Sequence, residues 1–229
     1  MQYVADGGGR LAPAARRGLA HLACLGGDFP TAHAVVLTLG WPGRHHRVDD
    51  DIWWPHGDMH RAATSYEAAR TEAEQHGVAG ERATSQAQRA LALAFTDPHL
   101  ADDELDLAEQ LLAGPDLRAT TLTVKIAALI RDTSTDSGVP GRADVLRAEI
   151  RTAGLQAPEA LLDLTFAFHH AARGDAPGSA AAVGLLEQRT GGDYAYYADI
   201  TAFMNRRPTP STTVCWIEEE ESVRRRPGP

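Results

Sequence analysis

A Gly-Asp dipeptide recurs in one local context and limits the fold more than any other feature of this chain. Each copy is followed by a small residue, then by a bulky residue four positions on, then by alanine or leucine three further on. The copies begin at Gly27-Asp28, Gly57-Asp58 and Gly174-Asp175. Glycine ends helices, aspartate caps the next helix, and the spacing places the small and bulky side chains on one helical face. The pattern predicts closely packed helical hairpins.

The composition also favours helices. Of the 229 residues 43% are hydrophobic, but only 6% are aromatic, and alanine supplies much of the apolar fraction. Strands favour β-branched and aromatic residues, whereas alanine is the best helix former. We therefore expect an all-α chain of about ten or eleven helices in antiparallel pairs.

The positions of glycine and proline along the chain predict where its helices begin and end. We expect an unordered lead over residues 1–11, a helical domain over 12–205 and a mobile charged tail over 206–229. Residues 44–56 are predicted to form a short polar helix ended by Pro55, and residues 133–141 a polar loop. The other helices are expected at about 14–25, 28–39, 57–76, 80–96, 99–113, 116–132, 142–153, 158–173, 176–189 and 193–205.

These units resemble the tetratricopeptide repeat, a helical hairpin in which small and bulky residues interlock. The positions that match the repeat are Ala20, Ala32, Val36, Ala62, Tyr66, Ala69, Ala167 and Val183. In the second unit Asp49 and Asp50 replace the usual pair of an apolar and a small residue. The resemblance implies a right-handed superhelix, or α-solenoid, whose concave groove is lined by the first helix of each pair.

The units are most similar to the divergent repeats at the C-terminal end of bacterial multidomain NTPases and regulators. The resemblance implies a non-enzymatic scaffold or sensor module that binds a protein or peptide in bacterial regulation or signalling. Aromatic residues and histidine are the candidates for partner contacts: Trp53, Trp54, His169, Tyr194 and Tyr197. Each has an alternative role. The tryptophans can pack against the neighbouring hairpin, and the tyrosines can cap the last one. Of the two adjacent histidines, we expect His170 in the core and His169 toward the groove.

The net charge of −9 argues against nucleic acid or an anionic membrane as partner, because phosphate binding requires a basic surface. It favours a partner segment with basic character. The chain contains no apolar run long enough to span a bilayer and no signal-type segment, so we expect a cytoplasmic protein.

Residues 44–60 support a second hypothesis, a regulator that responds to a small molecule or metal ion held in the groove. His45, His46, Asp49 and Asp50 bring imidazoles and carboxylates to i/i+4 spacing, which suits a divalent cation if the segment is helical. A solvent-facing polar helix is the simpler interpretation. The cysteines Cys24 and Cys215 are too far apart in sequence to form a zinc motif, and we expect no cofactor. An enzyme is a third hypothesis, disfavoured because no nucleophile or acid/base set converges.

Overall fold

The computed structural model of the chain describes residues 5–7, 9–56, 58–136 and 138–190, which form ten α-helices and no β-strand. The helices are α2 (Ala12–Leu25), α3 (Phe29–Val36), α4 (His45–His56), α5 (Met59–Gln75), α6 (Ala79–Thr96), α7 (Pro98–Leu112), α8 (Arg118–Arg131), α9 (Val139–Ala153), α10 (Gln156–Ala172) and α11 (Ala176–Thr190). Two short 3₁₀ helices, η1 (Trp41–Gly43) and η2 (Asp132–Ser134), lie between them. The prediction of an all-α chain is confirmed for these residues.

The Gly-Asp dipeptides act at helix ends as the sequence predicts. Gly27 and Gly174 adopt positive φ angles of 75° and 72°, a conformation that glycine reaches without the steric cost of a Cβ. The carboxylate of Asp28 then accepts a hydrogen bond from the Thr31 backbone N–H at 3.1 Å and caps α3. Asp58 caps α5 in the same way. Gly57 lies outside the described residues.

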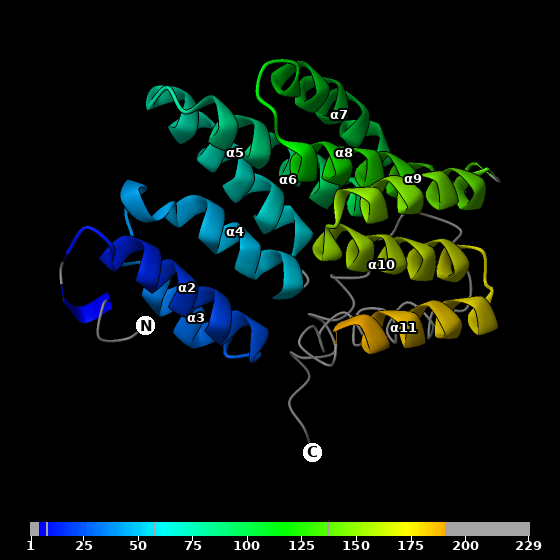
Figure 1. Cartoon of the computed structure of the whole chain (residues 1–229), viewed down its shortest axis with the longest axis horizontal. Helices are drawn as coiled ribbons and strands as arrows, with labels where there is room; N and C mark the ends of the chain where they lie inside the picture. The colour runs from blue at the N-terminus through cyan, green and yellow to red at the C-terminus, as the bar shows by residue number, and fades with distance from the viewer. Residues whose placement is uncertain (1–4, 8, 57, 137, 191–229) are drawn as a thin grey trace.

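Helices that are neighbours in the sequence are also neighbours in space. In Figure 1 they follow one another in chain order around an arc, from α2 and α3 to α11. Contacts join the two helices of successive pairs, such as α2 with α3 and α4 with α5. A second set of contacts joins alternate helices: α2 with α4, α6 with α8, and α8 with α10. The helices α4 and α6, by contrast, make little backbone contact.

Small side chains fill the contacts between helices. The buried residues form two clusters, one in α2, α3 and α4 and a larger one that extends from α4 to α11. Seven of the eight positions that match the repeat are buried, and Val183 is half-buried. Alanine at such a position lets two helix backbones approach closely, because no side chain keeps them apart. Helix α4 belongs to both clusters through Val48 and Trp54.

Buried polar groups also join the helices. Gln86 on α6 is fully buried, and its amide nitrogen donates to the backbone carbonyl of Glu104 on α7 at 2.8 Å and to its carboxylate at 2.6 Å. Arg70 on α5 donates to the amide oxygen of Gln86 at 3.2 Å. The side-chain amide of Gln86 thus holds α5, α6 and α7 in register, because both its nitrogen and its oxygen form hydrogen bonds.

The structure departs from the predicted layout in the polar loop and in the lead. The predicted polar loop over 133–141 is wrong at its end, because α9 already begins at Val139 with Pro140 in its first turn, where the missing N–H costs nothing. In the predicted lead, Ala5 is buried and its carbonyl accepts a hydrogen bond from Arg16 at 3.2 Å. The predicted last helix at 193–205 and the tail lie outside the described residues.

Candidate functional site

The three consecutive aspartates of α4 face three different neighbours. Asp49 accepts one hydrogen bond from the Trp53 indole at 3.0 Å and pairs with His33 of α3 at 2.9 Å. Asp51 accepts a hydrogen bond from the Tyr66 hydroxyl of α5 at 2.9 Å, and its other oxygen lies 3.8 Å from His21 of α2. Asp49 and Asp51 therefore tie α4 to the helices on either side.

Asp50 is fully buried in the place where the repeat has a small residue. Neither carboxyl oxygen has a hydrogen-bond partner of regular geometry among the described residues. Burial and the nearby charge of Asp51 raise the pKa of Asp50 to about 10, while the Ser65 hydroxyl acts in the opposite direction. Asp50 is consequently a neutral carboxylic acid at pH 7, which removes most of the cost of placing it in the interior.

The two adjacent tryptophans separate to different environments. Trp53 is half-buried between His33, whose ring centroid is 4.3 Å away, and the guanidinium of Arg61 at 4.7 Å from the indole. Trp54 is only 6% exposed and makes an edge contact with Phe95 of α6, with ring centroids 5.9 Å apart. Trp54 thus fills the space that opens where α4 and α6 diverge.

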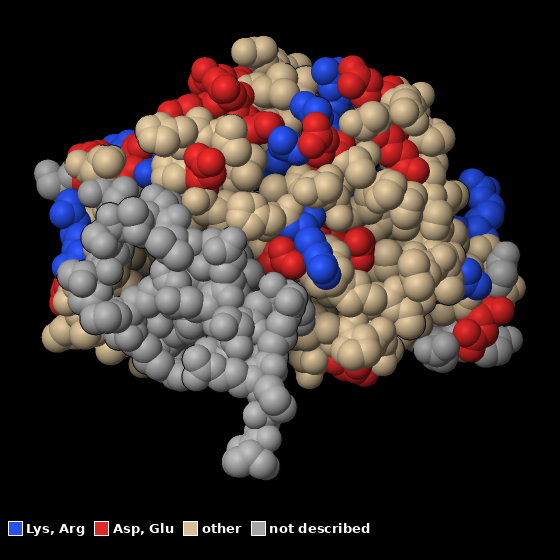
Figure 2. Space-filling model, turned by 180° about the vertical axis from the view of Figure 1, so that it is seen from behind, with Lys and Arg blue, Asp and Glu red and all other residues tan. Residues whose placement is uncertain are grey.

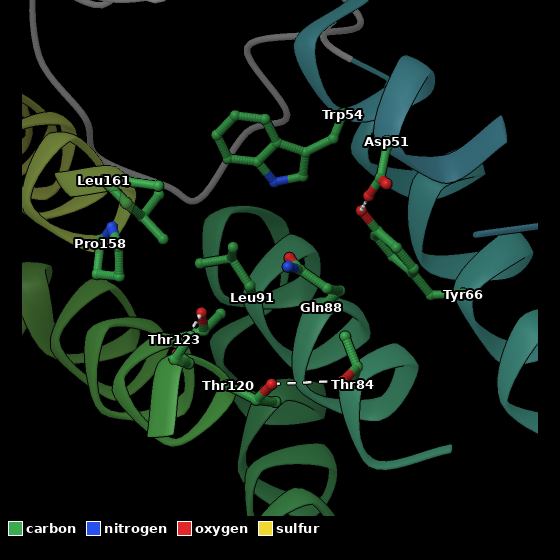
Figure 3. A pocket seen from close by; sticks show the side chains of 12 residues that line it. Asp51, Trp54, Tyr66, Thr84, Gln88, Leu91, Thr120, Thr123, Pro158 and Leu161 are labelled. Atoms are coloured by element: carbon green, nitrogen blue, oxygen red, sulfur yellow. Dashed lines mark hydrogen bonds between the residues drawn. The ribbon is translucent and has the colours of Figure 1, made fainter. Parts of the chain in front are cut away.

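A cavity of about 380 Å³ adjoins Trp54 (Figure 3). It is lined by one face each of α4, α6, α8 and α10, with Tyr66 contributed by α5. The lining consists of Asp51, Trp54, Tyr66, Thr84, Gln88, Leu91, Ala119, Thr120, Thr123, Ala157, Pro158 and Leu161. On α6 the lining residues are spaced i, i+4 and i+7, so a single helical face provides them.

The lining separates into polar and apolar walls. In Figure 3, Asp51 and Trp54 lie on one side, the paired hydroxyls of Thr84 and Thr120 on another, and Pro158 with Leu161 on a third. Asp51 is the one acidic side chain of this lining. Burial raises its pKa, although the charges of Arg47 and His21 and the hydrogen bond from Tyr66 oppose this effect.

The expected assignment of the adjacent histidines is reversed. His169 is buried at 4% exposure, whereas His170 is half-buried and its ring pairs with Asp175 at 2.8 Å. His170 lies next to the Gly-Asp turn, so the Asp175 carboxylate holds its ring at the surface. Burial, followed by the charge of Arg173, lowers the pKa of His169. The expectation that His169 faces a groove is therefore wrong.

The predicted metal candidates come together only in part. His45 and His46 lie side by side, with ring centroids 3.9 Å apart, and Glu72 of α5 joins them. Asp49 and Asp50 do not belong to this group. Burial, followed by the charge of His45, lowers the pKa of His46. Tyr194 and Tyr197 lie outside the described residues.

The part of the surface drawn in colour in Figure 2 shows no basic stripe. Acidic and basic side chains are mixed over the face seen in Figure 2. Among the described residues, none of the helices combines the length and apolar character that crossing a bilayer requires.

Comparison with models of known protein families, with curated proteins and with solved structures found no match for this chain. Its resemblance to the tetratricopeptide repeat therefore depends on its own residues alone.

Sequence reasoning missed most residues of the cavity. Thr84, Gln88, Thr120 and Leu161 belong to helices predicted correctly, but nothing in their local sequence distinguishes them from other surface positions. The available signal was indirect. The resemblance implied that alternate helices line a groove, and the four helices whose faces line the cavity, α4, α6, α8 and α10, alternate along the chain.

Proposed function

We propose that this chain is a non-enzymatic binding module of tetratricopeptide type, and that its cavity takes an extended peptide segment of a protein partner. One observation carries the proposal: four helices that would be first helices of successive repeats line one cavity. The contacts of α2 with α4, α6 with α8 and α8 with α10 support a stacked array of hairpins.

The lining suits a peptide. Thr84, Gln88 and Thr120 can each donate and accept hydrogen bonds, which matches the alternating N–H and C=O groups of an extended backbone. Leu91 and Leu161 offer apolar surface for a side-chain stem. The volume of about 380 Å³ falls within the usual range of about 300–1,000 Å³ for binding pockets.

The preferred peptide carries an arginine or lysine. Asp51 is the acidic group of the lining, and a basic side chain can lay its methylene stem on the leucines while its charged head reaches the carboxylate. The net charge of −9 favours the approach of such a segment at low salt.

Selection from a displayed library of random peptides tests this proposal. We expect enrichment of sequences that contain a basic residue next to apolar ones. The Ala157→Arg variant should bind the selected peptides at least tenfold more weakly, since it places a bulky cation at an exposed position of the lining. Affinity is measured by fluorescence anisotropy.

Val145→Arg is the matched control, because Val145 is an exposed residue of α9 outside the cavity, at 72% exposure. It should bind the peptides as the native chain does. Equal losses in both variants, or peptides without any basic residue, would contradict the proposal.

A further inference from the structure

The junction of α4 and α5 contains a cluster of metal-binding side chains outside the cavity. His45 and His46 come from the first turn of α4, and Glu72 comes from the last turns of α5. One ligand atom of each residue lies within 4.8 Å of the other two. The Nδ1 atom of His45 is 3.7 Å from a carboxylate oxygen of Glu72.

From this arrangement we propose that His45, His46 and Glu72 bind a divalent transition-metal ion of the zinc class. Two imidazoles and one carboxylate form a ligand set that zinc accepts, with water in the remaining position. Nitrogen donors disfavour calcium and magnesium, which prefer oxygen ligands.

The distances require only a small adjustment. Zinc–ligand bonds of about 2.0–2.2 Å place neighbouring ligand atoms about 3.3–3.5 Å apart in a tetrahedron. The 3.7 Å separation of His45 and Glu72 is close to this value, and the other separations, which all lie within 4.8 Å, need to shrink by no more than about 1.5 Å. The side chains of His45 and Glu72 are 29% and 20% exposed, so their rotamers have room to change.

A simple ion pair does not account for the cluster as well. The Nδ1 atom of His45 is shielded from solvent and has no hydrogen-bond partner among the described residues. An ion pair with Glu72 also needs only one imidazole, yet the second ring lies against the first. A metal ion would use both rings and the buried nitrogen.

The nearby arginines pair with a carboxylate other than that of Glu72. Arg44 and Arg47 both pair with Glu81 of α6, at 3.4 and 3.0 Å, and the guanidinium of Arg44 also lies over Trp41. In the described part of the chain, the ion-pair contact of Glu72 within 4 Å is with the imidazole of His45 and not with an arginine or lysine. The carboxylate is thus left to a cation that the protein itself does not supply.

The bound ion would join the start of α4 to the end of α5. It would clamp one helical hairpin at its open end, where the two chain ends of the pair meet. This role is independent of peptide binding, because none of the three ligands lines the cavity.

Metal titration of the untagged, chelator-treated chain tests the proposal, with Co²⁺ as the spectroscopic probe and Zn²⁺ as competitor. Co²⁺ should give the intense visible absorption of a four-coordinate site, and equimolar Zn²⁺ should remove it. At about 100-fold excess over its dissociation constant, Zn²⁺ should raise the melting temperature by about 5–10 °C.

Two variants and one control identify the ligands. Glu72→Gln keeps the side-chain shape and should weaken Co²⁺ binding by more than the about 10–100-fold typical of a lost outer-shell partner. His46→Asn should do the same. His99→Asn, at an exposed position of α7, should bind as the native chain does. A native chain without the absorption band, or a Glu72→Gln variant with unchanged affinity, would overturn the proposal.

Discussion

At the scale of single residues, the environment of α4 gives similar side chains different chemistry. Pro55 has no N–H, so the carbonyl oxygen of Asp51 loses its helical donor, and the Cys24 thiol lies 3.8 Å from that oxygen instead. Burial, together with the charge of Asp51, raises the pKa of Cys24 to about 11, which keeps the thiol protonated and able to donate. Cys24 therefore acts as a buried structural donor.

Asp50 makes the stability of the protein depend on pH. The folded pKa of about 10 lies above the ordinary aspartate value of 3.8, so the folded chain retains a proton that the unfolded chain releases. The contribution of this retained proton to the free energy of unfolding is fully present below about pH 4 and is lost as the pH rises toward 10. Asp50→Asn should remove this dependence of stability on pH, because an amide side chain does not titrate.

The comparison of Asp50→Asn with the native chain by urea unfolding measures the effect. The free energy of unfolding of the variant, relative to the native chain, should rise by about 3 kcal/mol between pH 6 and pH 8. A relative stability that is the same at both pH values would show that Asp50 is ionised in the folded protein.

At the scale of helices, short side chains decide how closely the pairs pack. Ala62 on α5 is fully buried. Ala62→Trp should destabilise the protein by about 1–3 kcal/mol, because the indole forces the packed helices apart. Thermal unfolding measures the loss. The same replacement at exposed Thr71 of α5 should have little effect, and equal melting of Ala62→Trp and the native chain would disprove the tight contact.

The last helices are joined by a buried ion-pair network. Asp163 on α10 is 1% exposed and pairs with Arg147 of α9 and Arg189 of α11, both at 2.7 Å. Asp163→Ala removes this partner from both guanidinium groups, which keep Glu159, and should cost about 1–3 kcal/mol. Denaturant unfolding checks the value, with exposed Asp144→Ala as a control that should change stability by no more than about 0.5 kcal/mol. A loss as small as that of the control would contradict the network.

The helices were predictable because their signals are local. Gly27 and Asp28 end one helix and cap the next through contacts within a few residues. The burial of Asp50 and the network around Asp163 were not predictable, since each depends on which helix lies opposite. The reversed environments of His169 and His170 were not predictable for the same reason. Asp175 is near both histidines in sequence, but its carboxylate pairs with His170.

At the scale of the whole molecule, α4 connects the two core clusters. Val48 and Ile52 belong to the N-terminal cluster, while Trp54 belongs to the larger one. The cavity lies at this connection, where Trp54 contacts Phe95 while the backbones of α4 and α6 remain apart. The proposed peptide site is therefore a consequence of how α4 and α6 are spaced.

Site-specific photo-crosslinking tests the central proposal most directly. A benzophenone side chain is introduced at Gln88, inside the cavity, and separately at Val145, on the exposed face of α9. Each protein is irradiated with a selected basic peptide and analysed by mass spectrometry. We predict a peptide adduct from position 88 and none from position 145. An adduct from position 145 with none from position 88 would show that the peptide binds elsewhere.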